Sequence, residues 1–255
     1  MKVREMDIEI YRQYFNALEA KRDSGWQYDE MKSCGAKFNS LMCDRRYDKQ
    51  HQKFRDYEKE SKEIMFRLVL DSGQTLIDMG CGTGAFTIHA SKCLKKVYAV
   101  DISQAMLRCA RKKAMRAGLD NIEFCRGGFL TYEHYAEPVD AIVSVLVLHH
   151  LPDFWKLVGL KRLGKMLKTG GKLYLFDVVY SFDIERYESC IKEFIQAMVD
   201  RTGPEMKHAM DVHFRQEYST FGWVIEGLLE IAGFEIEKAD YKDDFFGAYL
   251  CTKKE

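Results

Sequence analysis

The feature of this sequence that most restricts its fold is a glycine-rich turn between two patterned segments. The turn, Asp-Met-Gly-Cys-Gly-Thr-Gly at 78–84, follows a short apolar run at 75–79 and leads into a helical pattern at 84–94. Glycines at alternate positions let the backbone turn sharply and leave no Cβ atom in the way of a ligand. A buried strand that passes through such a turn into a helix begins a parallel α/β sheet with a ligand site at the turn.

Strand and helix patterns alternate through the rest of this region. Further strands are expected at 96–100, 122–126, 139–148 and 172–179. A helix is expected at 103–118, with Ser103 as its N-cap, and another helix is expected to end at 169–171, before the last of these strands. Strands that alternate with helices form parallel units with right-handed crossovers.

The C-terminal part departs from this alternation. A helix expected at 218–234 runs into two strands, 234–241 and 245–253, with only three residues between them. A connection that short can join only antiparallel strands. We therefore expect the parallel sheet to end in an antiparallel hairpin.

Charge and composition exclude several classes of protein. The chain has 39 basic and 39 acidic residues, so no net field attracts nucleic acid. Its longest apolar run, at 141–148, is far shorter than the ~20 residues that cross a bilayer. The charged N-terminal segment does not resemble a signal peptide. We expect a cytoplasmic protein with no nucleic-acid partner and no membrane insertion.

Eight cysteines are spread along the chain without a C-x-x-C pair. This spacing is typical of reduced, mostly buried thiols rather than of a disulfide or zinc framework. No metal site is expected, although Cys34 and Cys43 leave open a soft-metal or metalloid substrate.

Two motifs carry a resemblance to a known family. Asp78-x-Gly80-x-Gly82-x-Gly84 resembles the first motif of class I S-adenosylmethionine-dependent methyltransferases, and Asp101, which ends the second strand, lies in a segment similar to their ribose-binding motif. The resemblance runs from about 75 to 179, and the terminal hairpin extends it. It implies S-adenosyl-L-methionine as the cofactor. The cofactor-binding residues implied are Asp78, Met79, Gly80, Cys81, Gly82, Gly84, Asp101, Ile102, Phe129 and Tyr47.

The implied roles divide among these residues. Residues 79–84 contact the methionine part of the cofactor, Asp101 accepts both ribose hydroxyls, and Ile102 packs on adenine. The chain departs from the family at Gly128, where many members have an adenine-binding aspartate, so stacking by Phe129 is expected to contribute there. Tyr47 resembles a tyrosine that closes over the cofactor, but a role in the core fits it equally well.

The expected architecture is a Rossmann-like α/β fold. A mostly parallel, seven-stranded sheet carries helices on both faces and ends in the hairpin. Residues 1–70 form an N-terminal helical cap, residues 71–255 form the core, and a lid-like insertion, expected to be helical, spans about 180–215.

Two other functions remain open. Gly80-x-Gly82-x-x-Ala85 also fits the fingerprint of a nicotinamide-dependent oxidoreductase. The acid at Asp78 and the terminal hairpin favour the methyltransferase. A non-catalytic S-adenosylmethionine-binding protein would keep the glycines and Asp101 but need no base.

The segment after the fourth expected strand points to the acceptor. Leu-His-His-Leu at 148–151 lacks the Asn/Asp-Pro-Pro-aromatic signature of enzymes that methylate amide or base nitrogens, and it resembles small-molecule enzymes such as the quinone-biosynthesis C-methyltransferases. We expect in-line transfer of a methyl group to a small-molecule acceptor, giving S-adenosylhomocysteine. His150 is the candidate base or substrate contact, and His149 is expected to pack in the turn and bond a carbonyl. A homodimer is possible.

Polar residues further along have structural interpretations. Asp153 is expected to be the N-cap of the next helix, and Ser219 or Thr220 the N-cap of the helix after 218. The segment 213–217 is expected to be a solvated loop, with a place in the pocket roof as its alternative.

Overall fold

The computed structural model describes residues 25–32, 34, 35, 53 and 55–254. Most of the expected N-terminal helical cap, with Cys43 and Tyr47, lies outside these residues, so the predictions made for them stay predictions.

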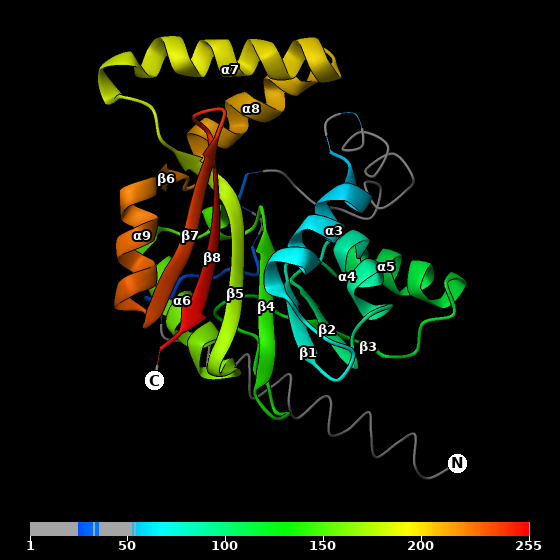
Figure 1. Cartoon of the computed structure of the whole chain (residues 1–255). Coiled ribbons are helices and arrows are strands. Elements are labelled where there is room, and N and C mark those ends of the chain that lie inside the picture. Colours follow the sequence, from blue (N-terminus) through cyan, green and yellow to red (C-terminus); the bar gives the residue numbers. More distant parts are fainter. Residues whose placement is uncertain (1–24, 33, 36–52, 54, 255) are drawn as a thin grey trace.

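Seven strands form one continuous sheet in the order β3-β2-β1-β4-β5-β8-β7 (Figure 1). The first five are parallel, whereas β8 runs antiparallel to both β5 and β7. The predicted α/β architecture with its terminal hairpin is therefore confirmed. The strands are β1 (Thr75–Met79), β2 (Lys96–Asp101), β3 (Ile122–Arg126), β4 (Val139–Val145), β5 (Leu167–Tyr180), β7 (Phe234–Lys242) and β8 (Phe246–Lys253).

Helices cover both faces of this sheet (Figure 1). On one face lie α3 (Tyr57–Leu68), α4 (Ala85–Ser91) and α5 (Gln104–Arg116), and on the other lie α6 (Asp153–Met166) and α9 (Gly222–Ile231). The strands of the parallel sheet are apolar on both faces because both are covered.

Alternate side chains of the strands build two separate cores. Leu76 and Val97 pack with Leu68 of α3 on one face, and Ile77 and Val100 pack with the apolar side of α6 on the other. All five side chains are almost fully buried. Burial of a side chain of this size contributes about 1.5–3 kcal/mol. Since α3 shares this core, the described end of the expected N-terminal cap is packed directly on the sheet.

Three boundaries differ from those expected. β4 ends at Val145 because Leu146 adopts a left-handed backbone with φ 59°. α6 ends at Met166 rather than near the Gly170-Gly171 pair, and β5 begins at Leu167 and includes that pair. A two-residue strand, β6 (Thr220–Phe221), pairs with the end of β5 and was not expected.

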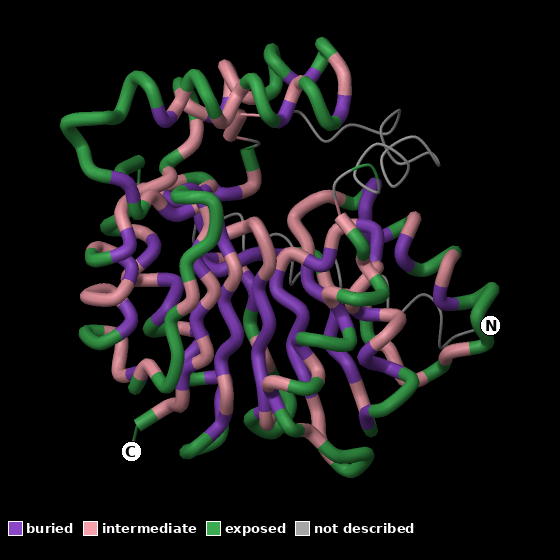
Figure 2. The backbone as a smooth tube through the Cα atoms, turned by 45° about the horizontal axis from the view of Figure 1, so that its top comes forward, coloured by how far each residue is buried: buried purple, intermediate pink, exposed green. Residues whose placement is uncertain are grey.

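The insertion after β5 is helical, as expected. It contains the 3-10 turn η2 (Ile184–Arg186), α7 (Tyr187–Thr202) and α8 (Glu205–Gln216). These helices lie beyond the carboxyl end of β5 (Figures 1 and 2). An aromatic cluster fixes them there, with Phe194 of α7 stacked on Phe245 at 4.1 Å between ring centroids. Their location fits the expected lid, whose closing role stays a prediction.

Among the described residues no helix has both the length and the apolar character that crossing a bilayer requires.

Candidate active site

The glycine turn leaves β1 at the carboxyl edge of the sheet. Gly80, Gly82 and Gly84 all have positive φ angles, of 81°, 54° and 81°. Side chains disfavour this conformation, which explains the glycines. A Cβ at Gly80 would overlap the Val147 side chain, and one at Gly84 would come within 2.9 Å of the Ala110 side chain, whereas one at Gly82 would meet nothing within 4 Å. Gly82 is thus the open point of the turn, where a ligand can approach the backbone.

Asp101 ties this turn to the end of β2. Its carboxylate accepts hydrogen bonds from the Gly82 amide at 2.9 Å and from the Ser103 amide at 2.7 Å. Burial raises the pKa of Asp101, and these two amides counteract the rise. Each carboxylate oxygen can accept more than one hydrogen bond. The predicted ribose-binding acid therefore lies directly at the open point of the turn. Ser103 is the N-cap of α5, as expected.

Asp78 is almost fully buried at the end of β1. The Thr87 hydroxyl, from the following helix, donates a hydrogen bond to its carboxylate. Burial raises the pKa of Asp78 to about 7, against the stabilising effect of that bond, and the nearby Asp101 raises it further. Thr87 is thus the hydrogen-bonding partner of this buried acid.

Several predicted contact residues point into the core rather than toward a ligand. Met79 is fully buried, Cys81 packs against Leu107, and Phe129 is 2% exposed. Only the backbones of Met79 and Cys81 can line the turn. Phe129 offers no open ring face for adenine in this conformation, so burial argues against the predicted stacking. Ile102, half-buried, remains the apolar candidate there.

A residue that the sequence did not single out occupies the place of the missing acid. Glu30 is 7% exposed, and its carboxylate accepts hydrogen bonds from the Leu130 amide at 2.8 Å and the Thr131 hydroxyl at 2.7 Å. A Cβ at Gly128 would come within 2.6 Å of Glu30 Oε2. Burial raises the pKa of Glu30. A carboxylate from the N-terminal segment therefore fills the space of a side chain at 128, and the glycine there makes room for it.

The loop after β4 touches the glycine turn. Val147, which would overlap a side chain at Gly80, leads into the 3-10 turn η1 (Leu148–His150). The Tyr28 hydroxyl donates a hydrogen bond to the His150 carbonyl at 3.0 Å, and the Tyr218 amide donates one to the His149 carbonyl at 2.8 Å. The two histidines are thus held next to the glycine turn by hydrogen bonds from an N-terminal and a C-terminal segment.

His149 is the centre of a buried polar cluster. Its Nδ1 hydrogen-bonds Asp177 of β5, and its Nε2 lies 3.3 Å from Glu217 Oε2. Burial lowers the pKa of His149, but the two carboxylates outweigh this and raise it to about 9. Burial raises the pKa values of Asp177 and Glu217, but His149 outweighs this and lowers both, so the two carboxylates stay ionised. The expectation that His149 is a packed residue is correct as to burial, but its side-chain partner is a carboxylate rather than a carbonyl.

His150 has the opposite electrostatics. Burial and the neighbouring His149 charge lower its pKa to about 4. The two rings lie 4.2 Å apart between centroids. His150 is therefore a neutral imidazole at pH 7, next to a positively charged one.

The segment 213–217 is not the solvated loop that we expected. His213 lies in α8 and is 8% exposed, and its Nδ1 hydrogen-bonds Glu217 while its Nε2 lies 3.0 Å from Ser219 Oγ. Arg215 and Gln216 are the exposed residues of this segment. The segment packs against His149 through His213 and Glu217. Its alternative place, in the pocket roof, stays a prediction. The sequence showed the acids but not their proximity, because Glu217 and Asp177 come from distant segments.

Two other expected helix caps were assigned to the wrong residues. α9 begins after Phe221 without a side-chain cap, because Ser219 turns to His213 and Thr220 pairs in β6. Asp153 is the first residue of α6, and its carboxylate binds Lys156.

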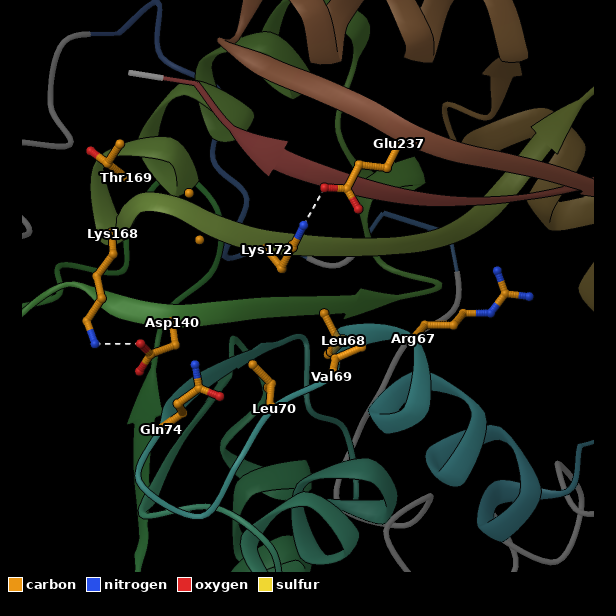
Figure 3. Close-up of a pocket in the computed structure, with 12 residues that line it drawn as sticks. Arg67, Leu68, Val69, Leu70, Gln74, Asp140, Lys168, Thr169, Lys172 and Glu237 are labelled. Carbon is orange, nitrogen blue, oxygen red and sulfur yellow. Dashed lines mark hydrogen bonds and ion pairs between the residues drawn. The ribbon is translucent and has the colours of Figure 1, made fainter.

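A pocket of about 420 Å³ lies at the opposite edge of the sheet (Figure 3). It is lined by the residues at the start of β4 and β5, including Asp140 and Lys172, and by the end of α3. In open α/β sheets ligands bind at the carboxyl ends of the strands. This pocket is therefore separate from the site described above.

Comparison with known proteins agrees with this geometry. Residues 76–171 match the family model described as a methyltransferase domain. An uncharacterized methyltransferase of Bacillus licheniformis is 30% identical over 188 residues, which are 68% of this chain and 84% of that protein. The chain belongs to the class I S-adenosylmethionine-dependent methyltransferases.

Other matches place this methyltransferase among varied relatives. The demethylmenaquinone methyltransferase of Lactococcus lactis is 27% identical over 169 residues, covering 62% of this chain and 66% of that enzyme. The structure of an S-adenosylmethionine-dependent methyltransferase from Clostridium acetobutylicum has the same fold, with a TM-score of 0.63 at 18% identity, covering 82% and 96% of the two chains. Membership of this family removes the oxidoreductase alternative.

Proposed function

We propose that this methyltransferase moves the methyl group of S-adenosylmethionine to a small-molecule acceptor by in-line displacement. The observation that carries the proposal is the contact between the glycine turn and the loop that holds the two histidines, through Gly80 and Val147. The strand order places β1 between β2 and β4, so the ends of these three strands meet. The cofactor would lie over Gly82 and Asp101, with its methyl group toward His149 and His150.

The reaction needs alignment more than acid–base strength. The acceptor's nucleophile attacks the methyl carbon, the carbon–sulfur electron pair returns to sulfur, and S-adenosylhomocysteine leaves. Holding the two reactants in line can contribute up to about 7–11 kcal/mol. The acceptor's proton passes to a base or to water.

The two histidines differ in what they can do for that proton. His149 carries a proton at pH 7 and cannot accept another, whereas neutral His150 can. A base with a pKa near 4 is a weak one, because proton transfer is most effective when the pKa lies near the working pH. His150 therefore suits an acceptor whose proton is already acidic, such as a phenol or an activated carbon acid. The named relative in Lactococcus lactis, a demethylmenaquinone methyltransferase, supports this class of acceptor.

Glu30 is our candidate for the adenine-binding acid that is absent at 128. Its carboxylate fills the space that a side chain at 128 would take, two residues beyond the end of β3. Glu30→Gln should weaken binding of S-adenosylhomocysteine while leaving unchanged, or even improving, binding of the analogue that has a 6-oxo group in place of the adenine amine. Equal losses for both compounds would contradict this role.

The function is tested by S-adenosylhomocysteine release. The purified protein is incubated with S-adenosylmethionine and three sets of acceptors: phenolic and quinol small molecules, peptides, and oligonucleotides. We expect turnover only with a small molecule. His150→Ala should lower the turnover rate, whereas His208→Ala, an exposed histidine on α8, should not. Turnover with peptide or nucleic acid alone would refute the proposed acceptor class, and binding without turnover on a broad panel would favour a non-catalytic protein.

A further inference from the structure

The buried cluster at the end of β4 contains an unassigned set of metal-ligand side chains. His149 and His150 from η1 and Glu217 from the end of α8 each offer one ligand atom, and these atoms lie within 4.8 Å of one another. They come from segments nearly seventy positions apart, which explains why no metal site was expected from the sequence.

The spacing within this set is close to that of a coordinated ion. Zinc binds imidazole nitrogen and carboxylate oxygen at about 2.0–2.2 Å, so two ligands of a tetrahedral ion lie roughly 3.3 Å apart. His149 Nε2 and Glu217 Oε2 are already 3.3 Å apart. His150 is the ligand that has to approach: the three ligand atoms lie within 4.8 Å of one another, so a side-chain movement of up to about 1.5 Å brings it to this spacing.

The surroundings of His149 fix it in the orientation that a ligand needs. Asp177 is a carboxylate that accepts from His149 Nδ1, so Nδ1 carries the hydrogen and Nε2 points at Glu217. The Asp177 carboxylate is itself held by the His149 amide at 3.2 Å and the Val178 amide at 2.7 Å. A carboxylate that orients a histidine from behind is the usual outer arrangement of a metal site.

The charge of the cluster also favours a cation. The side chains of Asp177 and Glu217 are 2% and 7% exposed, and buried carboxylates need compensating positive charge. In the metal-free protein the imidazoles of His149 and His213 lie directly against these carboxylates. A divalent ion between His149 Nε2 and Glu217 Oε2 would place positive charge next to both carboxylates.

We propose that His149, His150 and Glu217 bind a divalent transition-metal ion of the Zn²⁺ class. Asp177 and His213 act as positioning residues, the first behind His149 and the second at Glu217. Two imidazoles and one carboxylate suit Zn²⁺ better than Mg²⁺ or Ca²⁺, which prefer oxygen ligands. Three protein ligands leave a fourth position open, as in catalytic zinc sites. That position would lie beside the acceptor, where the ion could hold the acceptor's oxygen or sulfur and His150 would be a ligand rather than a base.

The test measures metal binding directly and needs neither cofactor nor acceptor. The protein is stripped with a chelator and then titrated with Zn²⁺ in competition with a chromophoric chelator. Wild type should bind one equivalent, and Co²⁺ should give the visible absorption of a tetrahedral site. Glu217→Gln, His150→Ala and Asp177→Asn should each weaken Zn²⁺ binding by about tenfold or more. Glu205→Gln and His208→Ala, exposed positions on α8, are the matched controls and should bind as wild type does.

Thermal unfolding provides a second measurement for variants that fold poorly. Zn²⁺ should raise the melting temperature of stripped wild type, and Glu217→Gln should abolish that rise. The proposal fails if wild type binds no Zn²⁺, if Mg²⁺ stabilises as much as Zn²⁺ does, or if Glu217→Gln binds as tightly as Glu205→Gln. A failure here leaves S-adenosylmethionine binding, measured separately on the stripped protein, untouched.

Discussion

Alanine substitutions in the glycine turn should separate its folding role from its binding role. Gly80 and Gly82 both have a positive φ, which costs an alanine about 1–2 kcal/mol. At Gly80 the added methyl also overlaps Val147, and overpacking of this kind costs a further ~1–3 kcal/mol. At Gly82 nothing lies within 4 Å. We therefore expect Gly80→Ala to lower the free energy of unfolding by about 2–5 kcal/mol and Gly82→Ala by only about 1–2 kcal/mol.

Gly82→Ala, the variant expected to keep most of its stability, should nevertheless lose affinity for the cofactor. A methyl group at Gly82 projects into the space where the cofactor approaches the backbone, so the affinity for S-adenosylmethionine should fall by about tenfold or more, or ~1.4 kcal/mol. Gly118→Ala is the matched control, because Gly118 also has a positive φ, of 67°, and open space around it, but lies at the end of α5.

The assay combines urea unfolding with calorimetric titration of S-adenosylmethionine. Gly82→Ala and Gly118→Ala should lose similar stability, and only Gly82→Ala should lose affinity. The reasoning is refuted if Gly82→Ala binds the cofactor as tightly as Gly118→Ala does.

Three further predictions concern stability. The carboxylates raise the pKa of His149 from 6.5 to about 9. They therefore stabilise the chelator-treated protein fully below pH 6.5, and this stabilisation, up to ~3 kcal/mol, is lost as the pH rises through 9. Urea unfolding between pH 6 and 10 should show the loss in wild type and much less of it in Asp177→Asn. Thr87→Val removes the hydroxyl donor to Asp78 and should cost about 1–3 kcal/mol; an unchanged urea midpoint would contradict that role. Ser103→Ala removes the cap of α5 and should cost about 1 kcal/mol, with no loss if the cap is not formed in solution.

The fold was predictable because local patterns determine most of it. The strands at 75–79 and 122–126 have the bounds expected, and the short connection before β8 required an antiparallel hairpin. The errors lie where tertiary contacts overrule local preference. Ser219, a good cap by type, is drawn to His213 instead. The pair Gly170-Gly171 continues β5 in place of ending α6.

The candidate site was predictable only in its continuous part. The glycines and Asp101 are close in sequence and belong to one βαβ unit, so their proximity follows from the fold. Glu30 and Glu217 reach the site from distant segments, and an isolated acid carries no signal of where it will lie. Asp177 did have a recognisable sequence signal: it is an acid near the carboxyl end of an apolar strand, and the same signal identified Asp101.

The central claim is that the turn after β1 and the acid after β2 together bind one molecule of S-adenosylmethionine. Calorimetric titration of wild type and Asp101→Ala with this compound tests it most directly, with circular dichroism to show that both proteins are folded. We predict saturable binding of one equivalent to wild type and an affinity at least about tenfold lower for the variant, since hydrogen bonds to a charged group contribute roughly 1.5–3 kcal/mol. No heat and no thermal shift with wild type, or equal affinities for the two proteins, would contradict the claim.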